Sequence, residues 1–164
     1  MKNLHIKNLN NTNTIEYYLN KLEIYENEFD KLTTEVIELY CESNNPKYNS
    51  KDLKYIGNKL NQKEIKRKQL KTKYKTLATT LLNHFLTELQ ELNKLNQKLD
   101  NNNNIVKHYI DDIKNNKEEY LNIEDLKNIQ NSINSIKTIL NNGELIIDIL
   151  KYNKLKGEKW KIYI

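Results

Sequence analysis

The sequence predicts an all-α protein, arranged as an elongated coiled coil or helical hairpin with a small C-terminal helical module and a short extended tail. Apolar residues recur at alternating spacings of 3 and 4 along most of the chain, which is the heptad pattern of a coiled coil. Its 164 residues include one proline and three glycines, whereas a sheet protein of this length needs many more turn residues. Hydrophobic residues make up only 37% and charged residues 30%, which suits helices that bury a single stripe.

The first helix is predicted from Thr14 to Glu42, after a flexible N-terminal arm of residues 1–13. Asn13 and Glu16 are spaced as a capping pair at its start. Pro46 is expected to end the helix, because proline disfavours helical conformation at the preceding residue. The apolar seam of this helix keeps the heptad pattern over its whole length. It consists of Ile15, Tyr18, Leu22, Tyr25, Phe29, Leu32, Val36 and Leu39. So narrow a stripe requires another helix lying on it.

The second helix is predicted from Lys51 to Asp100, with Asn49 or Ser50 as its N-cap. Its seam begins in the same 3 and 4 spacing and then steps by four residues, a stutter that locally unwinds a coiled coil. The first part comprises Leu53, Ile56, Leu60, Lys63, Arg67, Leu70, Tyr74, Leu77 and Leu81, and the second part Phe85, Leu89, Leu92, Asn96 and Leu99.

Folding these two helices antiparallel about the Pro46 loop places Leu39 opposite Leu53 and Ile15 opposite Leu77, with Arg67 facing Tyr25. Charge supports this hairpin, because residues 14–42 carry a net −6 and residues 63–75 a net +6. The basic patch consists of Lys63, Lys66, Arg67, Lys68, Lys71, Lys73 and Lys75. We expect it to pair with an acidic helix of this chain or of a sister subunit; contact with a nucleic-acid backbone is the alternative.

Residues 101–104 are four asparagines and predict a loop, followed by a second helical segment over residues 105–142. This segment contains two predicted helices. The first runs from Ile105 to Leu121, and its apolar face consists of Val106, Tyr109, Ile113 and Tyr120. The second has Asn122 as its N-cap, and its apolar face consists of Leu126, Ile129, Ile133, Ile136 and Leu140. Asn141–Gly143 is predicted to stop the helix.

Residues 143–164 are predicted to form a C-terminal docking module, in which a short apolar helix from Glu144 to Tyr152 precedes an extended tail. A local core is the simpler interpretation, and docking on a partner the functional one, because apolar clusters and tryptophan concentrate binding energy. The candidate docking residues are Leu145, Ile146, Ile149, Leu150 and Trp160.

Sequence features that indicate catalysis are missing. His5, His84 and His108 are too dispersed for a metal motif, and His84 is expected to be a packed side chain. Cys41 is the only cysteine, so a disulfide within the chain and a cysteine-based zinc site are excluded. No nucleotide-binding loop or hydrolase motif occurs. We therefore expect no enzymatic activity, no cofactor and no metal.

Location and partners follow less directly from composition. The net charge of +5 comes almost entirely from lysine, and the abundance of Lys, Asn, Ile and Tyr indicates an A/T-rich gene, which weakens the lysine excess as evidence for nucleic-acid binding. No apolar run reaches the ~18 residues of a membrane span. The N-terminus has no apolar core typical of a secretory signal. We expect a nuclear or cytoplasmic protein that does not contact a membrane.

The segment Glu144–Lys151, followed by Gly157 and Trp160, is similar to the C-terminal end of the CENP-H family of the inner kinetochore. That resemblance implies a non-enzymatic centromere subunit acting in chromosome segregation, paired with a sister coiled-coil protein in a hetero-oligomer and bound to a helical-repeat protein. The alternatives are a basic nucleic-acid-binding accessory or viral protein, and a coiled-coil subunit of a transcription or membrane-tethering complex.

Overall fold

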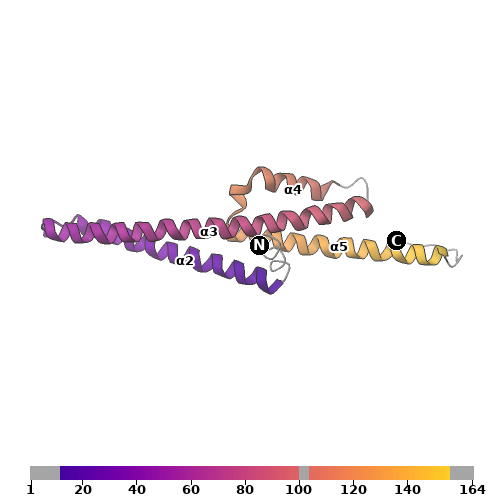
Figure 1. Ribbon diagram of the computed structural model, residues 1–164, viewed down its shortest axis with the longest axis horizontal. Helices are drawn as coiled ribbons and strands as arrows, with labels where there is room; N and C mark the ends of the chain where they lie inside the picture. Colours follow the sequence, from indigo (N-terminus) through magenta and orange to yellow (C-terminus); the bar gives the residue numbers. More distant parts are fainter. Residues whose placement is uncertain (1–11, 100–103, 156–164) are drawn as a thin grey trace. The chain divides into compact units, whose positions relative to one another are not determined.

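The computed structural model describes the backbone of residues 12–99 and 104–155, and the side chains of residues 14–99 and 104–142. Every element of this part is helical, without any strand (Figure 1). The elements are α2 (Thr12–Ser43), α3 (Ser50–Leu99), α4 (Ile105–Asn115), the short 3-10 helix η1 (Lys117–Tyr120) and α5 (Ile123–Leu155). The prediction of an all-α fold is confirmed. The predicted extended tail from Trp160 to Ile164 and most of the N-terminal arm lie outside the described residues.

Helices α2 and α3 begin and end within two residues of their predicted bounds. At the start of α3, the Asn49 side chain accepts a hydrogen bond from the Asp52 N–H at 2.9 Å, and the Asp52 carboxylate accepts one from the Asn49 N–H at 3.2 Å. This reciprocal pair satisfies backbone donors that a helix start leaves free, so Asn49 is the N-cap. The predicted cap at Asn13 is wrong, because α2 already begins at Thr12.

Two predicted boundaries in the second half of the chain are also wrong. First, α4 ends at Asn115, where the Asn116 backbone N–H and side-chain amide both donate to the Asp112 carbonyl, at 3.1 and 3.0 Å, and satisfy a carbonyl of the last turn. Tyr120 consequently lies in η1. Second, α5 continues through Asn141–Gly143, so no separate helix begins at Glu144. One glycine costs a helix about 1 kcal/mol, which weakens a helix of this length without ending it.

The chain divides into two units, which we describe separately. The hairpin unit comprises Met1–Leu81 with Leu121–Ile123, and the bundle unit comprises Leu82–Tyr120 with Glu124–Ile164. The division falls inside α3, so the two halves of one continuous helix belong to different units. The sequence assigned residues 14–100 to one hairpin or coiled coil, whereas the structure groups residues 82–99 with α4 and most of α5.

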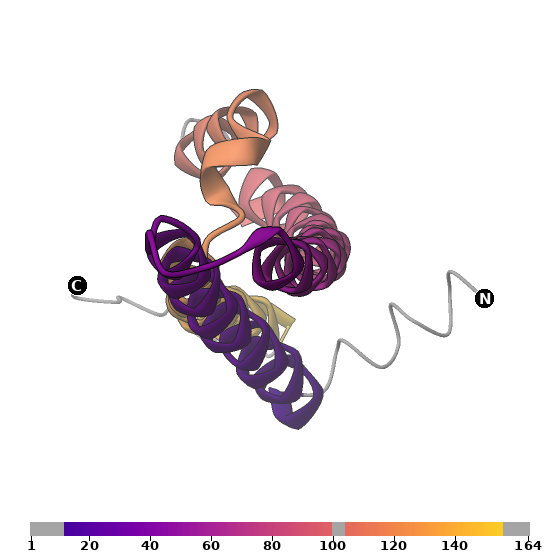
Figure 2. The ribbon, with the colours of Figure 1, turned by 90° about the vertical axis from the view of Figure 1, so that its left-hand side faces the viewer.

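In the hairpin unit, α2 and the first half of α3 lie side by side and are joined by the loop of residues 44–49 (Figures 1 and 2). Every predicted seam position of α2 is turned inward: Ile15, Leu22 and Val36 are buried, and the others are half-buried. On α3 the seam is mostly half-buried, although Leu53 near the loop is 44% exposed. The seam is therefore the packed face of the hairpin.

In the bundle unit, the second half of α3, α4 and α5 each contribute a buried apolar face. The core consists of Leu82, Phe85, Leu86, Leu89, Val106, Ile110, Ile113, Leu126, Ile129, Ile133 and Leu140. The predicted seams of α3 and α5 are inside, as expected. Leu82, Leu86 and Ile110 are additional buried positions that a single stripe does not include. A helix buried on more than one side has more than one neighbour.

Candidate functional site

The basic patch is joined to α2 by an ion pair. Lys63 Nζ lies 2.6 Å from Glu35 Oε2, and both side chains are about one-third exposed, at 30% and 32%. The hydrogen bond from Lys63 lowers the pKa of the Glu35 carboxyl and outweighs its partial desolvation. Pairing of the basic patch with the acidic helix of the same chain, predicted from the two net charges, is thus present at this position.

Arg67 makes the second connection between the two helices. Its guanidinium Nη1 donates to both Glu64 carboxylate oxygens at 3.0 Å, and its Nε donates to Thr33 Oγ1 at 3.2 Å. The guanidinium carbon also lies 5.0 Å from the centre of the Phe29 ring, within the range of a cation–π contact. The arginine therefore bonds along its own helix and packs on the facing one.

These contacts correct the predicted register of the hairpin. The prediction placed Lys63 opposite Phe29 and Arg67 opposite Tyr25, whereas Arg67 lies over Phe29. Lys21 of α2 itself approaches the Tyr25 ring, at 5.9 Å. Arg67 contacts Phe29 and Thr33, on either side of Leu32, and Lys63 contacts Glu35, next to Val36. The α2 positions that face these two residues are therefore about seven positions, one heptad, from those expected. Two heptad seams remain aligned after such a shift, so the apolar pattern alone does not select between the two registers.

The other lysines of the patch are exposed. They are Lys66, Lys68, Lys71, Lys73 and Lys75, the last of which has a partner of its own. The sequence grouped all seven basic side chains together. The structure divides them into Lys63 and Arg67, which are part of the hairpin interface, and five exposed lysines. By helical spacing, Lys68, Lys71 and Lys75 lie along one side of α3, and Lys66 and Lys73 lie along another.

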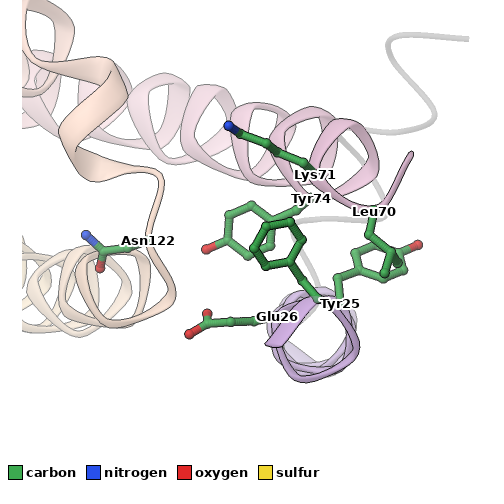
Figure 3. A pocket seen from close by; sticks show the side chains of 7 residues that line it. Tyr25, Glu26, Leu70, Lys71, Tyr74 and Asn122 are labelled. Carbon is green, nitrogen blue, oxygen red and sulfur yellow. The ribbon is translucent and has the colours of Figure 1, made fainter. Parts of the chain in front are cut away.

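A groove of about 430 Å³ opens beside this interface (Figure 3). It is lined by Tyr25, Glu26 and Phe29 of α2, by Leu70, Lys71 and Tyr74 of α3, and by Asn122. Sequence reasoning identified four of these as seam positions but did not predict an opening. The available signal was the concentration of bulky aromatic rings at 25, 29 and 74, which pack less closely than aliphatic side chains on such a seam.

Tyr74 ties the segment Leu121–Ile123 to the hairpin. Its hydroxyl donates to the Leu121 carbonyl at 2.9 Å. Burial raises the pKa of the Tyr74 hydroxyl to about 12, and the nearby negative charge of Glu26 acts in the same direction, against a backbone hydrogen bond at Ile123. The phenol therefore stays neutral and remains a hydrogen-bond donor at physiological pH.

The bundle unit contains a buried polar cluster. His84 Nε2 and Glu88 Oε1 share a hydrogen bond of 3.1 Å, with the two side chains only 1% and 11% exposed. Lys137 Nζ lies 3.6 Å from the other Glu88 oxygen, an ion-pair distance that is too long for a good hydrogen bond. The expectation that His84 is a packed side chain is confirmed.

The described side chains include no group of three or more His, Cys, Asp or Glu residues that could hold a metal ion. None of the described helices is both long and apolar enough to cross a membrane. Four of the predicted docking residues lie in α5, where only their backbone is described: Leu145, Ile146, Ile149 and Leu150. The fifth, Trp160, lies outside the described residues.

Comparison with protein-family models, with curated proteins and with solved structures gave no significant match.

Proposed function

We propose that this chain is a non-enzymatic structural subunit that holds together a multiprotein assembly through its helices. The observation that carries the proposal is the number of large apolar side chains left exposed on those helices, from 44% to 70%. They are Tyr17, Ile24, Ile37, Tyr40, Leu53, Tyr55, Ile65, Ile105 and Ile139. Single exposed apolar residues are ordinary, but contiguous ones mark interaction sites.

The end of the hairpin concentrates these exposed residues. Ile37 and Tyr40 precede the loop of residues 44–49 and are 57% and 54% exposed, and Tyr55 follows it at 61%. Leu53, a seam position, is also open to solvent here. Burying such side chains against a partner removes apolar surface from water, which is the dominant favourable contribution to most protein–protein association. This supports docking of another subunit at the hairpin end.

For the particular assembly, we propose an inner-kinetochore complex acting in chromosome segregation, with the protein at centromeres in the nucleus. Support comes from the likeness of Glu144–Lys151 and Trp160 to the CENP-H family. The partners would be a sister coiled-coil subunit and a helical-repeat protein. A transcription or membrane-tethering complex would use the same helical surfaces, and the identity of the co-purified proteins separates the three.

Co-purification from the native cell followed by mass spectrometry tests the scaffold. We expect a stoichiometric hetero-oligomer containing other coiled-coil proteins; a monodisperse monomer without stable partners would contradict the proposal. Trp160→Ala should release the helical-repeat protein selectively, while Tyr163→Ala in the same tail serves as the matched control. Recovery of proteins from a different complex would keep the scaffold and reject the kinetochore.

A second candidate function is contact with nucleic acid, favoured by one observation: Lys66, Lys68, Lys71 and Lys73 stay exposed once the hairpin has formed. Phosphate contacts by lysine give affinities that fall steeply with salt. Fluorescence anisotropy with labelled duplex DNA at two salt concentrations tests it. Salt-sensitive binding that is lost when Lys66 and Lys73 are both replaced by Glu would favour this function over the scaffold.

A further inference from the structure

We propose that the groove between Tyr25 and Tyr74 is the docking site for a helix of a partner protein. The partner helix places an apolar side chain in the groove, an acidic residue against Lys71 and a basic residue against Glu26. This proposal rests on the scaffold function proposed above and specifies the chemistry of one partner.

The floor of the groove fits an apolar anchor. Three rings, those of Tyr25, Phe29 and Tyr74, line it together with the Leu70 side chain. All four are half-buried in the hairpin, so each still presents part of its surface to the opening. The Tyr74 hydroxyl is already hydrogen-bonded to Leu121, which leaves the ring rather than a free polar group facing an occupant. A volume of about 430 Å³ is in the range of sites that bury a large ligand group.

The two walls of the groove carry opposite charges. Figure 3 shows Lys71 on the α3 side and Glu26 on the α2 side, with the rings between them. Neither side chain has an ion-pair partner among the residues that the structure describes, so both charges are available to an occupant.

Helical spacing extends both walls beyond the groove. Glu23 and Asp30 lie three and four residues from Glu26, and Lys68 and Lys75 are spaced in the same way about Lys71, so each set follows one side of its helix. All four are exposed. An apolar floor between an acidic and a basic wall is the surface that two helices offer to a third, whose flanks must then carry the opposite charges in the opposite order.

This arrangement excludes a partner of uniform charge as the best fit. A nucleic-acid backbone or a wholly acidic helix would be attracted by Lys71 but repelled by Glu26, and phosphates gain nothing from the rings. A wholly basic helix would be attracted by Glu26 but repelled by Lys71. Only a helix with one acidic and one basic flank satisfies both walls while it fills the apolar floor.

The test uses a short fluorescein-labelled synthetic helix with a Leu/Phe stripe, Glu on one flank and Lys on the other, added to the full-length protein. A second peptide with Glu on both flanks is the matched probe. Tyr25→Ala should weaken binding of the mixed-charge helix about tenfold, as for a buried aromatic anchor. Tyr17→Ala, an exposed tyrosine of the same helix that does not line the groove, should leave it unchanged.

Charge reversal gives variants whose folding is not at risk, because the side chains are exposed. Glu26→Lys should weaken the mixed-charge helix about two- to fivefold, as expected for one exposed ion pair, and should tighten the all-Glu helix. Lys71→Glu should weaken both peptides. Glu28→Lys and Lys73→Glu make the same charge changes on the same helices outside the groove and should have little effect.

Three outcomes would overturn the proposal: no binding by the native protein, equal effects of the groove variants and their matched controls, or binding of the all-Glu helix by the native protein that is tighter than binding of the mixed-charge helix. Self-association that is lost in Tyr25→Ala, without peptide binding, would assign the groove to a second copy of this chain and would also overturn it. If native complexes are recovered while the groove variants behave like their controls, the groove inference fails and the scaffold function stands.

Discussion

The two halves of α3 differ in how many of their faces are buried. From Ser50 to Leu77 the only buried side chain is Ile56, and the other seam positions are half-buried apart from the exposed Leu53. From Leu82 to Asn96 the helix buries side chains on several sides, including consecutive residues such as Phe85 and Leu86. A helix that packs on one neighbour buries one stripe, while a helix in a bundle buries a wide face. The width of the apolar stripe therefore reports the number of neighbours.

The polar contacts of the two halves differ in the same way. The Lys63–Glu35 pair of the hairpin unit is about one-third exposed, and exposed pairs contribute little to stability. The Glu88 carboxylate of the bundle unit is 11% exposed and lies between His84 and Lys137. Buried charges are costly to leave without a partner. We therefore expect substitutions in the bundle unit to affect stability and those in the hairpin unit to affect mainly alignment.

The chain's two phenylalanines provide the sharpest test of this contrast. Phe85 of the bundle unit is fully buried, whereas Phe29 of the hairpin unit is half-buried under Arg67. Phe85→Ala should lower the free energy of unfolding by about 3–5 kcal/mol, because it leaves a cavity. Phe29→Ala should cost less, about 1–2 kcal/mol, since less area is lost from the interior. Urea unfolding followed by circular dichroism measures both, and equal losses would contradict the contrast.

Acid should destabilise the bundle unit through Glu88. Burial alone would raise the pKa of this carboxyl, but the hydrogen bond with His84 and the charge of Lys137 outweigh it, so the pKa is lowered. A lowered pKa stabilises the fold above the unfolded value of about 4.3, and the contribution is lost as the pH falls through the folded value. The protection factors of the bundle unit's amides, which are corrected for the intrinsic pH dependence of hydrogen exchange, should therefore fall on acidification below about pH 4.

Glu88→Gln keeps the shape of the side chain and removes the charge. We expect it to cost about 1–3 kcal/mol at neutral pH and to flatten the acid dependence. Glu91→Gln, at an exposed position one turn along α3, is the control and should retain the native pH profile. An unchanged profile in Glu88→Gln would show that other carboxyls are responsible for the acid sensitivity.

The hydrogen bond from Tyr74 to Leu121 should have a smaller effect. Tyr74→Phe removes only the hydroxyl and leaves the Leu121 carbonyl without this donor, which should cost about 0.5–1.5 kcal/mol. Tyr55→Phe, at a tyrosine that is 61% exposed, is the control and should be close to neutral. Ultraviolet difference titration provides an independent check. In the native protein the hydroxyl pKa values of Tyr74 and Tyr120 are both about 12, and Tyr74→Phe should retain only the Tyr120 ionisation in this range.

The sequence was sufficient to predict the fold class and the inward faces, because burial of a single stripe leaves a periodic pattern. The seams from Ile15 to Leu39 and from Leu126 to Leu140 were predicted from spacing and are inside the structure. The stop expected at Gly143 was wrong for a physical reason, since one unfavourable residue weakens a long helix without ending it.

The register and the groove could not be predicted in this way. A heptad repeat stays aligned when one helix slides by a whole heptad, so the choice depends on contacts between particular side chains, such as Arg67 with Phe29 and Thr33. The groove arises where aromatic rings fill the seam incompletely, which depends on side-chain orientation rather than on hydrophobic spacing. The division of α3 into two halves was visible in the stutter before Phe85, but the stutter alone does not identify the additional neighbours.

The smallest expected effect concerns the ion pair that marks the register. Lys63→Gln should raise the pKa of the Glu35 carboxyl toward its ordinary value, because the hydrogen bond that lowers it is lost, while the stability should stay nearly unchanged. Carboxyl chemical shifts in an NMR titration measure this directly, and Lys73→Gln, outside the interface, should leave Glu35 as it is. In the register predicted from the sequence Lys63 would face Phe29 instead, so a Glu35 carboxyl that does not respond to Lys63→Gln would favour that register.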